Sequence, residues 1–465
     1  MMKKLILIPI LFLAKWGFSQ IVQPLFGGVN NNVSDLTIYD GKLIIGGGFN
    51  TVDSMNIWGI CSWDGQYFDS LGPGLKDPDS NYPRLLKRLY VYNNKLYIGG
   101  AFDSIGSIRV NGLAAWNGIN WSALNTGVFS VDPFNQTFNN GVVADIFEYD
   151  NQLHIFGCFE YVYTSAVNST AKWDGNYLTL GIPDLDCYAG LGVQYKGKAI
   201  VTSNSFDRFL GISNLGQYNG DNSWTSLDSA FGTWGGIYKM LEYKGDLYIA
   251  GYFLKAMGNN GNFIVRWNGE EWDDLMGGAN DIIGDIAILN DELIVAGYFS
   301  QIGNIQANRL AKWDGSKWCG YNLDIKNYDG TGGAIYAVEG YNDKIYIGGN
   351  FASVNGINAN RICALDIPDS AWVCGSPLAV KEEKSVNFSI FPNPASDFIT
   401  IKNKINQNGN YTYSIFDYQG KKIKDGSLSF SNSTEKISIQ EFNSGIYFIR
   451  IENEKGVSVE KFVKL

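Results

Sequence analysis

The fold of this chain follows from one short stretch, Lys42-Leu-Ile-Ile-Gly-Gly-Gly-Phe49, because the sequence repeats it. The apolar run ends in glycines and a phenylalanine, a pattern typical of a buried strand that a neighbouring backbone approaches closely. A degenerate copy, Lys198–Phe206, keeps the phenylalanine and loses the glycines. The clear copies are Lys95–Phe102, Gln152–Phe159, Asp246–Phe253, Glu292–Phe299 and Lys344–Phe351. The phenylalanines lie 46 to 57 residues apart, so the repeat predicts seven units.

Every unit has the same plan around this stretch. An apolar-alternating strand precedes it, and turn residues such as Asp40-Gly41 or Asn93-Asn94 join the two, because they tolerate the positive φ of a tight hairpin. A loop of about ten residues follows, and then a second hairpin whose turn lies between two aromatic residues, as with Trp63 and Tyr67. Each unit is therefore expected to contain four strands.

Seven four-stranded units predict an all-β fold, a seven-bladed β-propeller over residues 20–378. The glycine doublet and the aromatic residue that follows it after some sixteen positions resemble kelch-type, galactose-oxidase-like propellers over residues 21–376. The WD40 type is excluded because its Gly-His signature is missing. Ile21–Phe26 is expected to be an extra outer strand that pairs with the last blade and closes the ring.

The repeat pattern of the sequence ends at a linker, residues 379–385. Residues 386–465 consist of short alternating stretches separated by glycine turns, which predicts a small, immunoglobulin-like β-sandwich. This segment contains the motifs Phe391-Pro392-Asn393-Pro394, Gln419-Gly420-Lys421, Ser444-Gly445-Ile446-Tyr447-Phe448 and the basic end Lys461–Leu465 with Lys464. With these motifs the segment resembles the type A sorting domain of the type IX secretion system of Bacteroidetes. The resemblance implies that type IX machinery carries the protein across the outer membrane, removes this domain, and releases the rest or attaches it to the surface.

The first 19 residues read as a secretory signal peptide. Lys3 and Lys4 precede the apolar run Leu5–Ala14, and small residues before Gln20 form a cleavage site. That run is too short to span a bilayer, and no other stretch approaches the required length, so no transmembrane segment is expected. The sequence thus predicts a secreted or cell-surface protein that passes through the periplasm.

Charge is distributed unevenly along the chain, whose net charge is −10. The N-terminal 19 residues carry +3 and residues 386–465 carry +2, which leaves −15 on residues 20–385. Such an acidic surface repels phosphate backbones and anionic lipids. Nucleic acid is therefore excluded as a partner.

Six cysteines in an exported chain permit disulfides. Cys363 and Cys374 lie at equal distances from the Pro368-Asp369 turn, so a hairpin there would place them opposite each other and within bridging distance; the alternative is two buried thiols. Cys158 and Cys187 are a second candidate pair, between neighbouring repeats. Cys61 and Cys319 have no evident partner.

Residues that could carry catalysis are sparse. His154 is the only histidine and occupies a repeat position where other units have tyrosine, so no histidine-based triad, zinc site or copper site is expected. The polar stretch Asp77-Pro-Asp-Ser-Asn81 begins like a calcium loop but lacks its glycine and final glutamate, so calcium stays a weak alternative to no cofactor. The carboxylate pairs Glu270-Glu271 and Asp273-Asp274 fall on an outer hairpin turn and are interpreted as surface residues.

Two functions remain open. The long, variable loops lie at one face of the predicted propeller, where ligands usually bind. Aromatic residues in these loops are suited to stacking on sugar rings or, alternatively, to packing the loops themselves. They are Trp58, Tyr82, Phe134, Tyr161, Tyr163 and Trp234. The first hypothesis is a non-catalytic binding or adhesion propeller for a glycan or protein. The second is a carbohydrate-active enzyme, a polysaccharide lyase or glycosidase, with its site on the same face. The lack of a catalytic cluster favours the first.

Overall fold

The computed structural model divides the chain into two compact units, Met1–Gly375 and Ser376–Leu465, and each is described by itself. The predicted signal peptide lies outside the described residues. These are 21–75, 85–131, 138–163, 165–167, 169–182, 189–203, 215–227, 235–254, 262–375, 388–403, 409–417, 421–430, 434–453 and 456–465.

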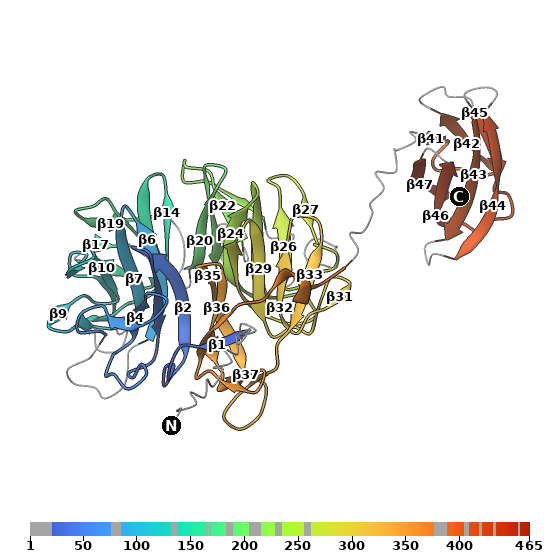
Figure 1. The fold of residues 1–465 in the computed structure, drawn as a ribbon. Helices are drawn as coiled ribbons and strands as arrows, with labels where there is room; N and C mark the ends of the chain where they lie inside the picture. Colours follow the sequence, from blue (N-terminus) through green and yellow to red (C-terminus); the bar gives the residue numbers. More distant parts are fainter. Residues whose placement is uncertain are drawn as a thin grey trace, which may run out of the picture. The chain divides into compact units, whose positions relative to one another are not determined.

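The first unit consists of antiparallel sheets that repeat one strand order, and each is called a blade below (Figure 1). Blade 1 contains β2 (Val33–Tyr39), β3 (Lys42–Gly47), β4 (Ile60–Trp63) and β5 (Phe68–Ser70), paired in that order. The stretch singled out in the sequence is β3, whose residues are buried almost throughout. The predicted tight turn before it is present, with Asp40 and Gly41 at φ of 49° and 70°. The period-2 pattern and the turn residues thus predict this hairpin correctly.

The other blades repeat the order. Blade 2 contains β6 (Leu85–Tyr92), β7 (Lys95–Ala101), β10 (Leu113–Trp116) and β11 (Trp121–Ala123). Blade 3 contains β14 (Val142–Tyr149), β15 (Gln152–Cys158), β18 (Thr170–Trp173) and β19 (Leu178–Leu180). Blade 4 contains β20 (Ala189–Tyr195), β21 (Lys198–Ser203), β22 (Leu215–Tyr218) and β23 (Trp224–Ser226).

Blade 5 contains β24 (Gly235–Tyr243), β25 (Asp246–Phe253), β26 (Ile264–Trp267) and β27 (Trp272–Asp273). Blade 6 contains β28 (Ile283–Leu289), β29 (Glu292–Gly297), β32 (Arg309–Trp313) and β33 (Trp318–Asn322), with β40 (Val373–Cys374) as a fifth strand. Blade 7 contains β35 (Ala334–Tyr341), β36 (Lys344–Asn350), β39 (Ile362–Leu365) and the N-terminal strand β1 (Val22–Pro24).

The ring closes through blade 7. The first strand of each blade contacts the first strand of the next, from β2 through β6, β14, β20, β24 and β28 to β35, and β35 contacts β2 again. β1 pairs with β39, with Val22 opposite Leu365, which confirms the expected outer strand near the N-terminus. The described residues therefore form a closed β-propeller of seven blades whose first strands surround the axis.

Tyrosines at the ends of the first strands tie neighbouring blades together. The phenol of Tyr39 donates to the Asn94 carbonyl in the first turn of blade 2, at 3.1 Å. Tyr195 makes the same bond to the Gly245 carbonyl of blade 5, and Tyr341 of blade 7 donates to the Gly41 carbonyl of blade 1, at 2.8 Å. The repeated tyrosine before the first turn is thus a contact between blades as well as a strand end.

Two kinds of loop leave the blades at the same end, because the strands alternate up and down. They are the loop after the second strand of a blade and the connection to the next blade, and this end is called the loop face. Short strands extend several of these loops: β8 (Ser104–Ile105) and β9 (Ile108–Arg109), β12 (Val128–Val131) and β13 (Phe138–Asn140), β16 (Tyr161–Val162) and β17 (Ser165–Ala166), β30 (Gln301–Ile302) and β31 (Ile305–Gln306), and β34 (Ile325–Lys326), β37 (Ser353–Val354) and β38 (Ile357–Asn358).

The structure corrects the predicted disulfide between Cys363 and Cys374. Cys374 is instead bonded to Cys319, which is 55 residues away in sequence. The expected hairpin does not form, because β39 is held between β36 and β1 and leaves Cys363 a buried free thiol inside blade 7. The chain then passes through the short 3₁₀ helix η2 (Asp369–Ala371) and pairs as β40 with β33 of blade 6, which places Cys374 opposite Cys319.

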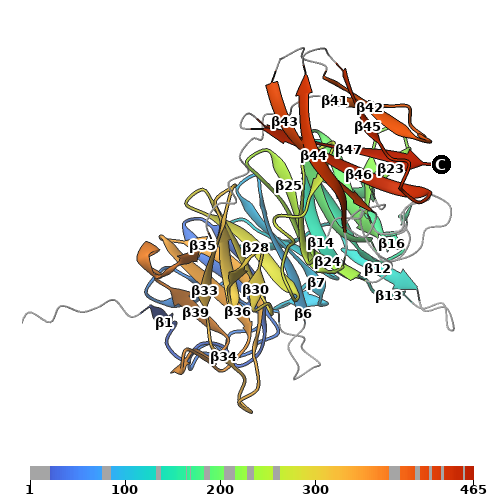
Figure 2. The ribbon, with the colours of Figure 1, turned by 90° about the vertical axis from the view of Figure 1, so that its right-hand side faces the viewer.

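The second unit is a two-layer β-sandwich (Figure 2). One sheet contains β41 (Phe388–Phe391), β42 (Phe398–Asn403) and β45 (Thr434–Ser438). The other sheet contains β43 (Gly409–Asp417), β44 (Lys422–Phe430), β46 (Gly445–Asn453) and β47 (Gly456–Lys464). Its core draws on both sheets, and Ile399, Ile415 and Ile449 are fully buried in it. This agrees with the sandwich that alternation and glycine turns predict.

Candidate functional site

Charged residues occupy the axis of the ring. Asp35, Arg88, Asp145, Lys239 and Asp285 each lie four residues before the end of a first strand, and they are called the axial charges. The Arg88 guanidinium lies 2.8 Å from Asp145 and 3.8 Å from Asp35, and the Lys239 ammonium lies 2.9 Å from Asp285. Lys239 of blade 5 also interacts electrostatically with Asp35 of blade 1, so the cluster spans the ring.

Each axial aspartate also joins two blades. The backbone N–H of Leu89 donates to Asp35, that of Gly192 to Asp145 and that of Val338 to Asp285, at 2.7 to 2.9 Å. Burial raises the pKa of Asp35 and of Asp145, and Arg88 opposes the rise in both. The axial charges therefore have a structural role in joining the blades, because each carboxylate accepts a hydrogen bond from a backbone N–H and lies near a cation.

Four tyrosines lie at the loop-face side of the axial charges in blades 5 to 7. Tyr238 immediately precedes Lys239 on β24, and Tyr336 holds the same position on β35. Tyr252 is the last residue but one of β25 in blade 5, and Tyr298 directly follows β29 in blade 6, so both lie where the chain enters the loop face. These four residues are called the tyrosine cluster. Tyr238 and Tyr252 are each 46% exposed and Tyr336 is 37% exposed, although the neighbouring strand residues are half-buried beside Tyr238 and buried beside the other two.

The tyrosine cluster is held together by polar and charge contacts. The phenol of Tyr298 forms a hydrogen bond with Tyr336 and also interacts with Tyr238, which in turn interacts with Tyr252. The Arg309 guanidinium lies 5.3 Å from the centre of the Tyr298 ring. Burial, followed by the Tyr336 phenol, raises the pKa of Tyr298 to about 12, so this hydroxyl stays protonated and remains a hydrogen-bond donor at neutral pH.

The loop aromatics proposed from sequence lie elsewhere. Trp58 is half-buried, and its indole N–H donates to the Asn56 side chain at 2.6 Å. Tyr161 is half-buried on β16, and Tyr163, in the same hairpin, is 69% exposed. The remaining three, Tyr82, Phe134 and Trp234, lie outside the described residues. Trp58 belongs to blade 1 and the other two to blade 3, and a role of these aromatic residues in ligand binding stays a prediction.

The other chemical candidates have different outcomes. His154 is buried against Phe147 and Tyr149, and burial lowers its pKa to about 4, so it is a neutral core residue. The suspected calcium loop at residues 77–81 and Cys187, the proposed partner of Cys158, lie outside the described residues, and both suggestions stay predictions. Among the residues described, no group of three or more His, Cys, Asp or Glu is arranged to hold a metal ion.

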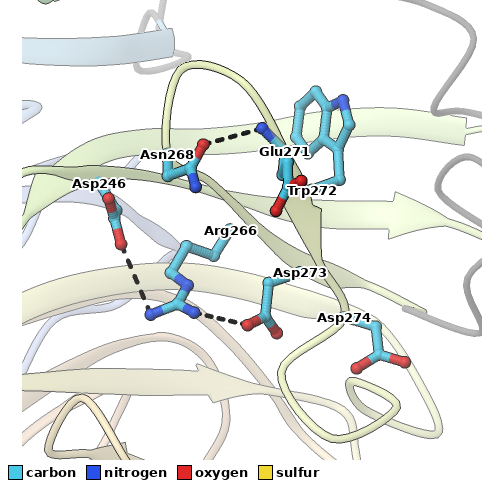
Figure 3. A pocket seen from close by; sticks show the side chains of 7 residues that line it. All are labelled: Asp246, Arg266, Asn268, Glu271, Trp272, Asp273 and Asp274. Carbon is cyan, nitrogen blue, oxygen red and sulfur yellow. Dashed lines mark hydrogen bonds and ion pairs between the residues drawn. The ribbon is translucent and has the colours of Figure 1, made fainter. Parts of the chain in front are cut away.

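A polar pocket lies at the outer edge of blade 5, on the side of the hairpin turns (Figure 3). Its volume is about 440 Å³, and it is called the acidic groove. Arg266 reaches between two carboxylates, at 3.5 Å from Asp246 and 2.5 Å from Asp273 (Figure 3). Asn268, Glu271, Trp272 and Asp274 complete the lining. Three of the four carboxylates that the sequence assigns to a surface turn, Glu271, Asp273 and Asp274, thus line a pocket, and Asp273 is paired with a cation.

The sorting motifs meet along β46 and β47 of the second unit. The Asn393 side chain accepts a bond from the Val463 N–H at 2.9 Å and donates to the Lys461 carbonyl at 3.1 Å. Pro392 and Pro394 on either side of it are exposed. Gly445 pairs with Lys464, and Tyr447 packs between Phe442 and Phe462. Gly420 lies outside the described residues. The opening motif is therefore bonded to the basic C-terminal strand.

Comparison with known families supports both units. The secretion system C-terminal sorting domain matches residues 389–465. The β-propeller of DUF5122, a domain of unknown function, matches residues 342–365, which lie in blade 7. No curated protein matches the chain. No helix in the described part of the chain is long and apolar enough to cross a membrane. The chain is thus a β-propeller protein with a sorting domain for type IX secretion, which indicates export to the cell surface or beyond.

Sequence reasoning missed the tyrosine cluster, although a signal is present. The position before the repeat phenylalanine is Gly48 in blade 1 and Ala101 in blade 2, but it is Tyr252 in blade 5 and Tyr298 in blade 6. Two adjacent units therefore depart from the repeat in the same way. Tyr238 and Tyr336 give no such signal, because an alternating strand with tyrosine reads as ordinary core.

Proposed function

We propose that this protein is a non-catalytic binding or adhesion propeller that the type IX system delivers to the cell surface or releases, and that its ligand is a glycan. A signal peptide at residues 1–19 would supply the first step, export to the periplasm, and the sorting domain the second. The kelch-type resemblance stays a prediction about the type of propeller and adds nothing to the choice of ligand.

The observation that supports a glycan is the tyrosine cluster. Exposed phenol rings offer flat apolar surfaces for stacking on sugar rings, and their hydroxyls offer hydrogen bonds to sugar hydroxyls. Tyr238, Tyr252 and Tyr336 project from strands of a closed ring, so the surface is rigid before the ligand arrives, which lowers the entropic cost of binding. Tyr298 lies between them as a protonated donor.

A panel of polysaccharides tests the proposal. The full chain is expected to be retained by at least one of them, and Tyr252→Ala and Tyr238→Ala are each expected to weaken retention about tenfold, since each removes one stacking surface. Tyr177→Ala is the matched control, because Tyr177 is 66% exposed but lies in blade 3 at the outer hairpin. Equal losses in all three variants would contradict the assigned site.

The same panel decides between binding and catalysis. Retention without release of new reducing ends supports a binding protein. Turnover of a retained polysaccharide would replace this proposal by the enzyme alternative, a lyase or glycosidase on the loop face. Retention of a protein ligand but of no glycan would leave the propeller as a binding module and overturn the ligand class.

A further inference from the structure

The outer edges of blades 5 and 6 are equivalent in register. Arg266 on β26 pairs with Asp273 of the last strand in blade 5, and Lys312 on β32 pairs with Cys319 in blade 6. The second strands begin with an acid in both blades, Asp246 and Glu292. The acidic groove of blade 5 therefore has a direct counterpart in blade 6 of the same chain.

The counterpart in blade 6 is filled by an extended segment of the chain itself. β40 adds to β33 as an antiparallel fifth strand, with Cys374 opposite Cys319. The segment just before it brings Asp369 to 3.2 Å from the Lys312 ammonium and the Trp372 ring to 5.0 Å from the same group. Lys312 is only 8% exposed as a result. This edge thus accepts an added strand that also supplies side chains complementary to the groove.

The groove in blade 5 has a cation and an acid at the same two positions, Arg266 and Asp246. Within the described residues, β27 is the last strand of its sheet. Its own Asp273 supplies the carboxylate that Asp369 supplies in blade 6, so Arg266 is paired without a covering segment. Glu271 and Asp274 add two more carboxylates to the lining. Four carboxylates and one guanidinium leave the groove with an excess of negative charge.

We propose that the acidic groove binds an extended, basic peptide segment of a partner protein, which adds to the edge of blade 5 at Asp273 as β40 adds to blade 6. Strand addition supplies the backbone contacts, and Lys or Arg side chains of the segment reach Glu271 and Asp274. The negative charge of the acidic groove favours a cationic side chain. At the equivalent position of blade 6, Lys312 instead favours the carboxylate of Asp369. This proposal is independent of the loop-face site.

Binding of a labelled peptide of alternating Lys and Thr residues tests the charge selection. The full chain is expected to bind this peptide, to ignore the alternating Glu and Thr peptide, and to bind more weakly as salt rises. The double variant Glu271→Gln, Asp274→Asn is expected to weaken binding about tenfold, because two partly exposed charge contacts are lost.

Glu270→Gln is the matched control, because Glu270 carries the same charge in the same turn but does not line the groove. Its binding is expected to equal that of the unaltered protein. An equal loss in this variant would mean general attraction to an acidic surface and would overturn the proposal. Binding of a second copy of the chain at this edge, seen as a dimer lost in the double variant, would overturn it as well.

Disulfide trapping tests the strand register. Asp273→Cys places a thiol at the position of Cys319 and leaves Arg266 paired with Asp246. A Lys-Thr peptide with one central cysteine, activated as a pyridyl disulfide, is expected to exchange rapidly with this thiol and release pyridinethione. Glu270→Cys is the control and is expected to react at least about tenfold more slowly. Equal rates would contradict strand addition at Asp273.

Discussion

Blades 5 and 6 place a basic residue at the same repeat position of the third strand, yet their outer edges end differently. In blade 6 the chain returns over Lys312 as a fifth strand and is bonded there through Cys319. In blade 5 no described strand adds to β27, and the groove around Arg266 is acidic. At their inner edges, however, the two blades are joined through Lys239 and Asp285. The inner edges of the two blades are therefore joined to each other, while the side chains at each outer edge determine which strand can be added there.

The largest effect is expected where the two blades meet at the axis. Lys239→Met removes the cation from Asp285 and leaves a buried carboxylate that still accepts the Val338 N–H. We expect the free energy of unfolding to fall by about 3 to 4 kcal/mol, since an uncompensated buried charge is costly. Urea unfolding measures the change. Lys239→Arg keeps the charge and should recover most of the loss; a mild effect of Lys239→Met would mean that the axial pair is dispensable.

The covered edge of blade 6 should respond next. Replacing both Cys319 and Cys374 by Ser frees the segment that covers Lys312, and we expect a loss of about 2 to 3 kcal/mol, because the bond constrains a long loop of the unfolded chain. Thermal unfolding with and without reductant measures it. Reductant should lower the stability of the unaltered protein and leave the double variant unchanged. Cys363→Ala keeps the bridge, so sensitivity to reductant should persist in that variant.

A pH effect of intermediate size is expected at Glu339 of blade 7. The pKa of Glu339 is raised to about 7, mainly by burial and in part by Asp285, while the Gly340 N–H and Lys239 oppose the rise. The folded state therefore holds this proton more tightly than the unfolded state, so the residue lowers stability as pH rises from about 4.5 to 7. Glu339→Gln should be about 1 to 2 kcal/mol more stable than the unaltered protein at pH 8 and equal to it at pH 4.

Thermal unfolding across this pH range measures the difference. Glu242→Gln, at an exposed position on β24, is the control and should follow the unaltered protein at every pH. A Glu339→Gln profile parallel to the unaltered one would show that this carboxyl does not couple folding to pH.

The smallest effect is expected at the open edge of blade 5. Arg266→Met removes a cation that is paired with Asp246 and Asp273 but remains partly exposed, so we expect less than about 1 kcal/mol of destabilisation. Lys312→Met at the covered edge should cost more than Arg266→Met, because Lys312 is almost fully buried under Trp372. Chemical unfolding of the two variants side by side measures the contrast, and the reverse order would refute the distinction between the edges.

Local sequence signals predict much of the fold. The glycine-rich repeat predicts the second strands, as with Lys42–Gly47, and Asp40-Gly41 predicts the turn before it. The N-terminal strand that closes the ring is also predicted, since an unpaired strand before the first unit has only the last blade to join. The disulfide is not predicted correctly. The prediction from the equal spacing of Cys363 and Cys374 about a turn requires a hairpin, which the neighbouring strands prevent.

The sites divide in the same way. Alternation identifies Tyr238 and Tyr336 only as strand residues, and nothing local shows that blades 5 and 7 place them near Tyr298 of blade 6. The carboxylates of the acidic groove are visible in sequence as neighbours in a turn, but their pocket depends on Arg266 from the adjacent strand. Both sites consist of residues from different strands, and these residues come together only when the blades have formed and the ring has closed.

The sequence by itself determined the all-β class, the seven repeated units and the sorting domain, because alternation, turn residues and short motifs act within a few residues of one another. Only the tertiary structure decided that Cys374 joins Cys319, that charged residues meet at the axis, and that a fifth strand covers the outer edge of blade 6 while no described strand covers that of blade 5. The physical reason is that ring closure brings equivalent positions of different units together. Which side chains then interact depends on their distance in space and not on their separation in the sequence.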